Sequence, residues 1–420
     1  MSRFAKASTY PALLTLIYAL TSLADGPQIT RALPSPAPSA FSTRAKEAQE
    51  FFLNPAGMST LSASAFFATF ELSYTDLLFT RSTETTMSGS RGGNPIAFSP
   101  GGGLFFVYHP EGNACIGLGA VSSLLVSQAY AIDWVGRYYF RGGKLAAFSI
   151  IPSIGYELSR QVSIGVGIVF TYGLFDQKAA VQNYVSPTDG ELGIKDNAWG
   201  FGANAGIMFQ PFDGTRLSLA YHSPVKLPFK ETPHFTGLDS GTERTLEEAG
   251  TIGRSIDLAV TLPQSATFGV FQQIPGEWAI FAEFGYYQWS RFGKATLAVS
   301  DPTSPTLVHP GKYQDTFCAA LGGEYRFAEN WLGSLKIAYE SSPVKDQDRT
   351  CDFVAGPAYR LGGGIRWKAG ETLELGATYE FIWSGDLSLD EYHGYWAGRV
   401  AGTYTNTSVN LLALTLAWGI

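Results

Sequence analysis

The sequence predicts an all-β protein: a transmembrane antiparallel β-barrel of about fourteen strands. Three observations carry this prediction: a composition suited to lipid contact, a two-residue alternation of apolar and polar side chains, and connections that alternate between short and long. Only 15% of the 420 residues are charged, whereas 47 are Gly, 29 Phe, 21 Tyr and 9 Trp. Such a composition is unusual for a soluble enzyme and suits sheets that meet lipid.

Composition also excludes two other classes of protein. After the first 24 residues, no stretch reaches the roughly 20 consecutive apolar residues of a transmembrane helix, so a bundle of membrane helices is excluded. The net charge is −7, and Lys and Arg do not cluster. A nucleic-acid partner needs clustered cations, so we expect none.

Residues 1–24 have the pattern of a secretory signal peptide. Arg3 and Lys6 precede an apolar run from Pro11 to Leu23, and the small residues Ser22 and Ala24 occupy the positions before a cleavage site. The alternative is a buried N-terminal helix with the same pattern. We therefore divide the chain into a signal peptide (1–24), an N-terminal segment (25–62) and a barrel (63–420).

Apolar and polar residues alternate in segments typical of strands with two different faces. In 162–172 the even-numbered residues are apolar, and Ser163, Gly165, Gly167 and Thr171 lie between them on the opposite face. The segments 331–340 and 372–381 show the same alternation. A soluble sandwich with its apolar face inward and a membrane barrel with its apolar face outward both produce this alternation. Short turns alternating with long, polar, Gly- and Pro-containing loops favour the outer-membrane barrel.

Counting segments between these connections gives fourteen strands, an even number, as bacterial outer-membrane barrels usually have. Pro263 interrupts the eighth and predicts a bend there. The predicted strands are Ala63 to Thr80, Gly101 to Tyr108, Ala114 to Leu124, Leu145 to Tyr156, Val162 to Phe175, Asn197 to Gln210, Thr215 to Lys230, Ile252 to Gln273, Trp278 to Phe292, Gln314 to Phe327, Trp331 to Ser342, Tyr359 to Lys368, Glu371 to Trp383 and Thr405 to Trp418.

An ordered set of short motifs resembles the FadL/TodX family of outer-membrane transporters of hydrophobic compounds. The motifs begin with Phe51-Phe52-Leu53-Asn54-Pro55-Ala56-Gly57-Met58 and continue with Trp134-Val135-Gly136-Arg137-Tyr138, Asn197-Ala198-Trp199-Gly200-Phe201-Gly202, Leu262-Pro263-Gln264-Ser265, Gln314-Asp315-Thr316 and Ser342-Pro343-Val344-Lys345-Asp346. The resemblance runs from about residue 40 to the C terminus.

This resemblance implies that residues 25–62 form a plug inside the lumen, and that long-chain fatty acids or aromatic hydrocarbons leave sideways through a gap beside the third strand. On that basis Asn54, Pro55, Ala56 and Gly57 belong to the plug and the lateral gate. Gly117 and Gly119, in the third strand, are either part of the gate, where glycine tolerates a bulged backbone, or ordinary barrel glycines. The Pro-rich stretch 33–38 departs from the family, so its role in gating is open.

Five residues are candidates for contact with a ligand. Phe51 and Phe52 are expected to pack inside the barrel, and Arg137, Arg326 or Lys336 offers a cation for a carboxylate. The alternative for these charges is a solvated network of both signs that holds plug and wall together. The sequence does not choose between the two.

The sequence does not favour an enzyme, a cofactor or a metal site. The five histidines lack metal-ligand spacing, and the adjacent His222 and Ser223 point to opposite faces of a strand. We expect a monomer in the bacterial outer membrane whose partners are lipid and a hydrophobic small molecule. A general diffusion porin or a surface adhesin is the alternative, and a disulfide between Cys318 and Cys351 is geometrically conceivable.

Overall fold

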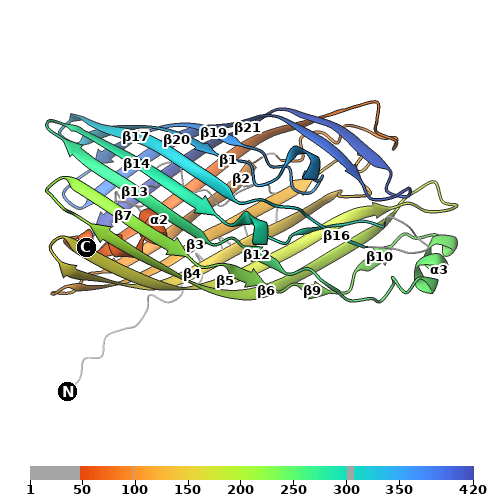
Figure 1. Ribbon diagram of the computed structural model, residues 1–420, viewed down its shortest axis with the longest axis horizontal. Helices are drawn as coiled ribbons and strands as arrows, with labels where there is room; N and C mark the ends of the chain where they lie inside the picture. The colour runs from red at the N-terminus through yellow and green to blue at the C-terminus, as the bar shows by residue number, and fades with distance from the viewer. Residues whose placement is uncertain (1–47, 97, 300–306) are drawn as a thin grey trace, which may run out of the picture.

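The computed structural model describes residues 48–96, 98–299 and 307–420 as one closed antiparallel barrel (Figure 1). Fourteen strands form its wall. They are β1 (Ala65–Arg81), β2 (Phe98–Tyr108), β3 (Ala114–Ala129), β4 (Gly142–Ser159), β5 (Val162–Val181), β6 (Gly190–Phe209), β7 (Thr215–His222), β13 (Ser265–Ile274), β14 (Trp278–Tyr287), β17 (Thr316–Ala328), β18 (Trp331–Glu340), β19 (Ala358–Lys368), β20 (Leu373–Tyr392) and β21 (Arg399–Gly419). Each strand pairs with its neighbours in the chain, and β21 pairs with β1 to close the ring. The predicted strand number is therefore confirmed.

The apolar face of the wall points outward, as the pattern of short turns and long loops predicts. On β5, Ile164, Val166 and Ile168 are exposed, while Ser163 and Thr171 are buried. On β18, Leu335 and Ile337 are exposed, whereas the intervening Lys336 is buried. An apolar band on the outside of a closed barrel is what a membrane-spanning wall requires.

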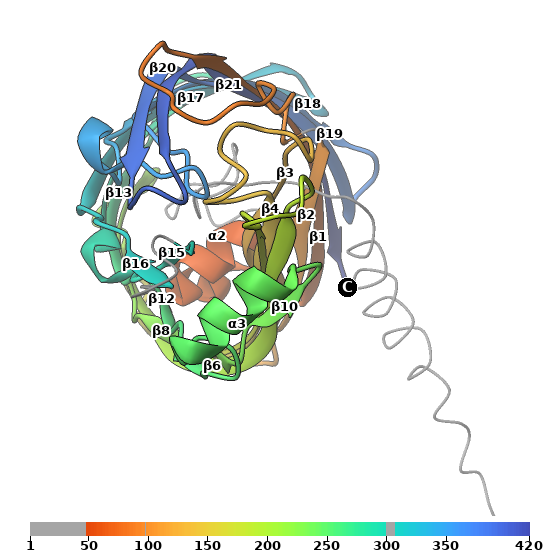
Figure 2. The same ribbon diagram turned by 90° about the vertical axis from the view of Figure 1, so that its right-hand side faces the viewer.

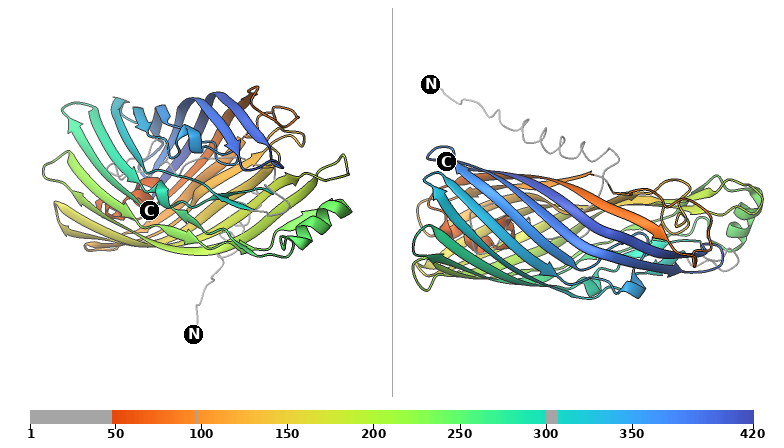
Figure 3. Two further views of the ribbon diagram at one scale, coloured as in Figure 1. Left: turned by 45° about the vertical axis from the view of Figure 1, so that its right-hand side comes forward. Right: turned by 90° about the horizontal axis from the view of Figure 1, so that it is seen from above.

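Two hairpins are longer than the sequence predicts. Residues 176–196 and 384–404 contain Gly and charged residues and were expected to be loops, but β5 and β6 continue to a connection at 182–189, and β20 and β21 continue to one at 393–398. Strands pair through backbone hydrogen bonds, which form whether the side chains are polar or apolar. Polar residues outside the membrane therefore do not end a strand. Figure 3 shows these hairpins extending beyond one end of the barrel.

The expected seventh and eighth strands are shorter than predicted. β7 ends at His222 and β13 begins at Ser265, because Pro224 and Pro263 cannot donate the backbone hydrogen bonds of a central strand. The residues between them form the short elements β8 (Val225–Leu227), β9 (Lys230–Glu231), β10 (His234–Thr236), α3 (Ser240–Glu248), β11 (Ile256–Asp257) and β12 (Val260–Leu262). Four further short elements belong to other long connections: η2 (Trp289–Arg291), β15 (Ala295–Leu297), β16 (Val308–Pro310) and η3 (Asp346–Asp348).

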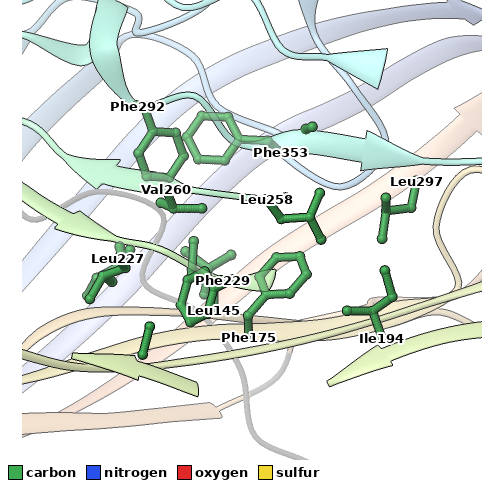
Figure 4. Close-up of a cluster of buried hydrophobic side chains, with 14 of the residues drawn as sticks. Leu145, Phe175, Ile194, Leu227, Phe229, Leu258, Val260, Phe292, Leu297 and Phe353 are labelled. Carbon is green, nitrogen blue, oxygen red and sulfur yellow. The ribbon is translucent and has the colours of Figure 1, made fainter. Parts of the chain in front are cut away.

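These long connections fill the outer half of the barrel with apolar side chains. Phe229 and Leu258 pack in one buried cluster with Phe175 and Ile194 from the wall, and with Phe353 (Figure 4). The alternation suggested that small and charged residues line the whole inner face of the barrel. The structure shows that large apolar side chains line part of it as well. Where the connections fold inward, the lumen is filled by a hydrophobic core of the kind found in soluble proteins.

The chain before β1 enters the ring of strands. α2 (Ala48–Leu53) is followed by the 3-10 turn η1 (Pro55–Thr60), and Figure 2 shows α2 inside the barrel. The predicted signal peptide and residues 25–47 lie outside the described residues. None of the helices in the described ranges combines the length and apolar character needed to cross a membrane.

The three cysteines are free thiols. Cys318 lies in β17, where it pairs with Gly285, and Cys351 lies in a buried turn of the connection before β19. The disulfide that loop positions made conceivable is therefore not formed. Cys318 packs against one buried apolar cluster and Cys351 belongs to another.

Candidate functional site

The wall has a local gap between β2 and β3. The two strands pair from Tyr108 with Ile116 up to Gly103 with Val121, and their pairing stops there. Beyond this point β2 stays paired with β1 back to Phe98, and β3 stays paired with β4 as far as Ala129. A hydrogen bond from the Ala129 amide to the Pro95 carbonyl, at 3.0 Å, joins the two sides again near the outer end.

A bulge in β3 accompanies the gap. The register between β3 and β4 shifts between Ser122 and Leu124, so the inward-facing residues change from odd to even numbers along the strand. Beyond the bulge, Leu124 and Val126 point inward and are buried. Bulges bend a strand and disrupt its ladder, which explains why the pairing with β2 ends here.

Gly117 and Gly119 lie before this bulge, in regularly paired backbone. Both pack closely against neighbouring side chains: a Cβ at Gly117 would lie 2.3 Å from the Met58 sulfur, and one at Gly119 would lie 2.6 Å from the Phe105 ring. The irregularity of the third strand is thus three to five residues beyond the glycines that the sequence singled out. Local sequence does not reveal it, because Ser122 and Ser123 have no special backbone preference.

A cavity of about 160 Å³ lies behind the gap, inside the lumen. Its lining includes residues from both sides of the gap, from the N-terminal segment and from the connection before β13. The lining residues are Phe52, Leu53, Glu71, Ser73, Ser99, Pro100, Gly101, Gly102, Val121, Ser122, Ser123, Leu124, Leu125, Ser149, Val169, Thr171, Ala203, His222, Ser223, Val225, Leu262, Pro263, Ser265, Thr267, Tyr287 and Leu411. Aliphatic and aromatic surface with a limited set of polar groups is typical of a site for a small hydrophobic ligand.

The turn Asn54–Gly57 is fixed to the wall beside this cavity. Asn54 is fully buried; its Oδ1 accepts a hydrogen bond from the Ala56 amide at 3.0 Å, and its Nδ2 donates one to the Ile207 carbonyl at 3.3 Å. The first bond caps η1, and Pro55 occupies the first position of that turn, where its missing N–H costs nothing. A buried amide with partners on both the turn and the wall fixes the position of the turn.

Glycines on the wall make room for the turn. A Cβ at Gly165 would lie 2.3 Å from the Pro55 carbonyl carbon, and one at Gly206 would lie 1.9 Å from the Asn54 Oδ1. Together with Gly155, which faces Ser59 and Pro55, and Gly117, which faces Met58, they place one glycine opposite the segment Asn54–Ser59 on each of four neighbouring strands, β3 to β6. The signal was present in the sequence as inward-facing glycines, but only the structure shows what they face.

The two predicted phenylalanines lie on different sides of α2. Phe51 is fully buried, with its ring centroid 4.9 Å from that of Phe67 and 5.6 Å from that of Phe105. Phe52 lines the cavity, and its ring lies 5.1 Å from the His222 imidazole. The sequence did not connect His222 with this segment; its Nε2 lies 3.0 Å from the Leu53 carbonyl oxygen.

The three predicted cations are not among the residues that line the cavity. Arg137 lies in the outer connection between β3 and β4 and pairs with Asp189 at 2.7 Å. Arg326 lies near the opposite end of the barrel and pairs with Glu277 at 3.3 Å, and both side chains are largely exposed. Lys336 is buried on β18, with its Nζ 3.6 Å from Glu380.

Two buried arginines that the sequence analysis did not single out form ion pairs with the buried acids of the wall. Arg366 pairs with Glu324 at 2.7 Å and with Glu374 at 3.1 Å. Arg360 pairs with Glu340 at 3.1 Å and lies 3.9 Å from Glu380. The Arg366–Glu324 pair reaches across β18 from β19 to β17, and the other pairs join neighbouring strands, so these charges connect four consecutive strands of the wall.

An acidic group in the outer connection between β7 and β13 gives a pH-dependent contact. The Asp239 carboxylate accepts hydrogen bonds from the amides of Ser186, Thr242 and Val185, which hold its pKa well below the usual range. Because the folded pKa is depressed, the stabilisation is present above the unfolded pKa of about 3.9 and is lost as the pH falls toward the folded value.

We expect acid to release α3 from the 182–189 connection. Hydrogen exchange of the Ser186 and Thr242 amides, corrected for the intrinsic rate, should accelerate below about pH 4 in the native protein. Asp239→Asn keeps an acceptor that does not titrate, so this variant should not show the acceleration. Equal pH profiles for the two proteins would contradict the prediction.

A sequence profile described as "Outer membrane protein transport protein (OMPP1/FadL/TodX)" matches residues 16–418. The chain belongs to this family. Family membership and the closed barrel with its apolar outer band place the protein in the outer membrane. The resemblance found from the sequence motifs is therefore confirmed.

Two relatives illustrate the distance within the family. The long-chain fatty acid transport protein of Escherichia coli O6:H1 is 26% identical over 57% of this chain and 60% of its own length. Outer membrane protein P1 of Haemophilus influenzae is 26% identical over 73% of this chain and 67% of its own. The chain thus spans about three fifths of the E. coli protein that it matches.

Solved structures share the fold at low sequence identity. A FadL homologue of Pseudomonas aeruginosa superposes with a TM-score of 0.78, at 17% identity, covering 89% of this chain and 94% of the homologue. The toluene transporter TodX of P. putida gives a TM-score of 0.63 at 14% identity, covering 93% and 98%. Both comparisons support the barrel architecture.

Proposed function

We propose that the protein transports hydrophobic small molecules, such as long-chain fatty acids or similar hydrocarbons, across the outer membrane. The main observation that supports this proposal is the cavity of about 160 Å³ directly behind the gap between β2 and β3. Relatives named as fatty acid and toluene transporters support the same class of ligand.

In this proposal the ligand leaves sideways through the gap into the membrane. An alkyl chain gains roughly 0.8 kcal/mol per CH₂ removed from water, so release into the periplasm would forfeit that gain. The outer rim of the gap carries exposed apolar side chains, including Phe98 and Leu118, which suit contact with lipid. A ligand could thus pass from an apolar lumen to lipid with little exposure to water.

Residues 25–62 act as the plug, and the Asn54–Gly57 turn is its anchor. The buried hydrogen bonds of Asn54 and the glycine-lined wall opposite the turn support this role. The alternative functions, a general diffusion porin or a surface adhesin, require no such anchor. Large, steady ion currents through the purified native protein in a planar bilayer would argue for the porin.

A substitution at Gly101 tests the lateral route. A Cβ there would point to the inner mouth of the gap, 3.3 Å from Glu71 Oε2 and 3.7 Å from Ser122 Oγ. We expect Gly101→Val to reduce cellular uptake of a radiolabelled long-chain fatty acid and of toluene about tenfold or more, since 1.4 kcal/mol added to the barrier is sufficient for a factor of ten.

Gly363→Val is the matched control, because Gly363 lies in β19 with its nearest neighbour atoms 3.6 Å or more from a new Cβ. Its uptake should equal that of the native protein. If Gly101→Val folds and transports at the native rate, the ligand does not leave through this gap. If neither ligand depends on the protein at all, the proposed transport itself is wrong.

A further inference from the structure

A chain of hydroxyl groups crosses the wall of the cavity next to the gap. The side-chain oxygens of Ser123 and Ser149 are hydrogen-bonded at 2.5 Å, and those of Ser149 and Thr171 at 2.8 Å. The three residues come from β3, β4 and β5, and all three line the cavity. Ser123 ends the odd-numbered, inward-facing series of β3, just where the register with β4 shifts.

This chain retains capacity for another hydrogen bond. Three hydroxyls carry three donors, of which the two internal bonds use two, and each oxygen has two acceptor lone pairs. Since hydroxyl hydrogens rotate, the chain can present either a donor or an acceptor to a ligand. It therefore suits a polar group that itself both donates and accepts.

The opposite side of the gap carries a carboxylate. Glu71 is 3% exposed, lines the cavity, and faces the same space beside Gly101 as Ser122 does. An ionised carboxylate only accepts hydrogen bonds, and its two oxygens offer about four acceptor sites, so it can bind a ligand O–H in addition to other partners. A ligand carboxylate has no proton to donate and has the same charge as Glu71.

We infer that the cavity and gap select an uncharged hydrophobic molecule with a hydroxyl head group, such as a long-chain alcohol or an alkylphenol, over both a fatty acid anion and a plain hydrocarbon. This inference rests on the proposed transport function and narrows its substrate class. The hydroxyl chain replaces the water lost by the head group, and the Glu71 carboxylate accepts a hydrogen bond from the ligand O–H. A hydrocarbon makes neither bond, and an anion cannot make the second.

Three ten-carbon probes test the inference: decan-1-ol, decanoate and butylbenzene. Uptake into cells that produce the native protein should be about tenfold faster for decan-1-ol than for either other probe at limiting concentration, because one hydrogen bond of about 1.4 kcal/mol corresponds to a factor of ten. Ser149→Ala combined with Thr171→Val should abolish the advantage of decan-1-ol over butylbenzene.

Glu71→Gln tests the charge separately. It keeps an acceptor and removes the negative charge, so decanoate uptake should rise about tenfold toward that of decan-1-ol. Ser163→Ala, an inward-facing substitution on β5 outside the cavity lining, is the control and should leave all three rates unchanged.

The outcomes separate the two proposals. Equal uptake of the three probes, or a preference that survives both the Ser149/Thr171 double substitution and Glu71→Gln, overturns the inference while transport stands. No protein-dependent uptake of any probe overturns the proposed transport function.

Discussion

Replacing Gly165 by alanine is expected to displace the Asn54–Gly57 turn from the wall and to open an ion-conducting path through the barrel. The new Cβ would lie 2.3 Å from the Pro55 carbonyl carbon and 2.4 Å from the Ala56 nitrogen. Both are backbone atoms of a turn held by proline and by the Asn54 cap, so they cannot move aside as a flexible side chain does. Overpacking of this kind costs about 1–3 kcal/mol.

The measurement is single-channel conductance in planar bilayers, together with ligand uptake by cells. We expect larger or more frequent openings in Gly165→Ala and reduced dependence of entry on ligand type. Gly193→Ala is the matched control: Gly193 lies in β6, and the nearest atom to its Cβ would be the His234 carbonyl oxygen at 4.0 Å. If both variants behave like the native protein, the turn does not close the lumen.

Replacing Arg366 by methionine is expected to reduce the free energy of unfolding by about 3–5 kcal/mol. The guanidinium is 6% exposed and pairs with Glu324, itself 3% exposed, so the substitution leaves a buried carboxylate without this cation. Removing both partners is less harmful than removing one, because no buried charge loses its counterion. We therefore expect Arg366→Met with Glu324→Gln to recover a large part of the loss.

Urea unfolding in detergent micelles, followed by tryptophan fluorescence, measures this effect. Arg326→Met is the control, since the Arg326–Glu277 pair is largely exposed and such pairs contribute about 0–1 kcal/mol. A loss in Arg366→Met no greater than that in Arg326→Met would show that the buried pair does not stabilise the wall.

Alternation and connection length were sufficient to predict the barrel, its strand number and the outward direction of its apolar face. These properties are recorded locally in the sequence. Each strand has its own apolar face for lipid, and short turns alternate with long loops along the chain. Prediction was poorer where the chain leaves the membrane. There, polar residues continue β20 and β21, and apolar residues of the connections fold inward to form the core around Phe229 and Leu258.

The candidate site was predicted in part. The Asn54–Gly57 motif was found from the sequence, and the structure places it against the wall beside the cavity. His222, Glu71 and the hydroxyls of Ser149 and Thr171 were not recognised as lining residues, because strands far apart in the sequence bring them together. The cations proposed for a ligand carboxylate instead pair with acids of an outer connection, of the wall and of the short turn between β13 and β14.

The sequence by itself determined an outer-membrane barrel with an N-terminal segment marked by Asn-Pro-Ala-Gly, since periodicity and turn chemistry are written residue by residue. Only the tertiary structure decided where the wall opens. The gap depends on the register between β3 and its two neighbours. The shift at Ser122–Leu124 turns Leu124 inward, and the pairing with β2 ends just before it, at Val121. Register is a relation between strands, and no single strand contains it.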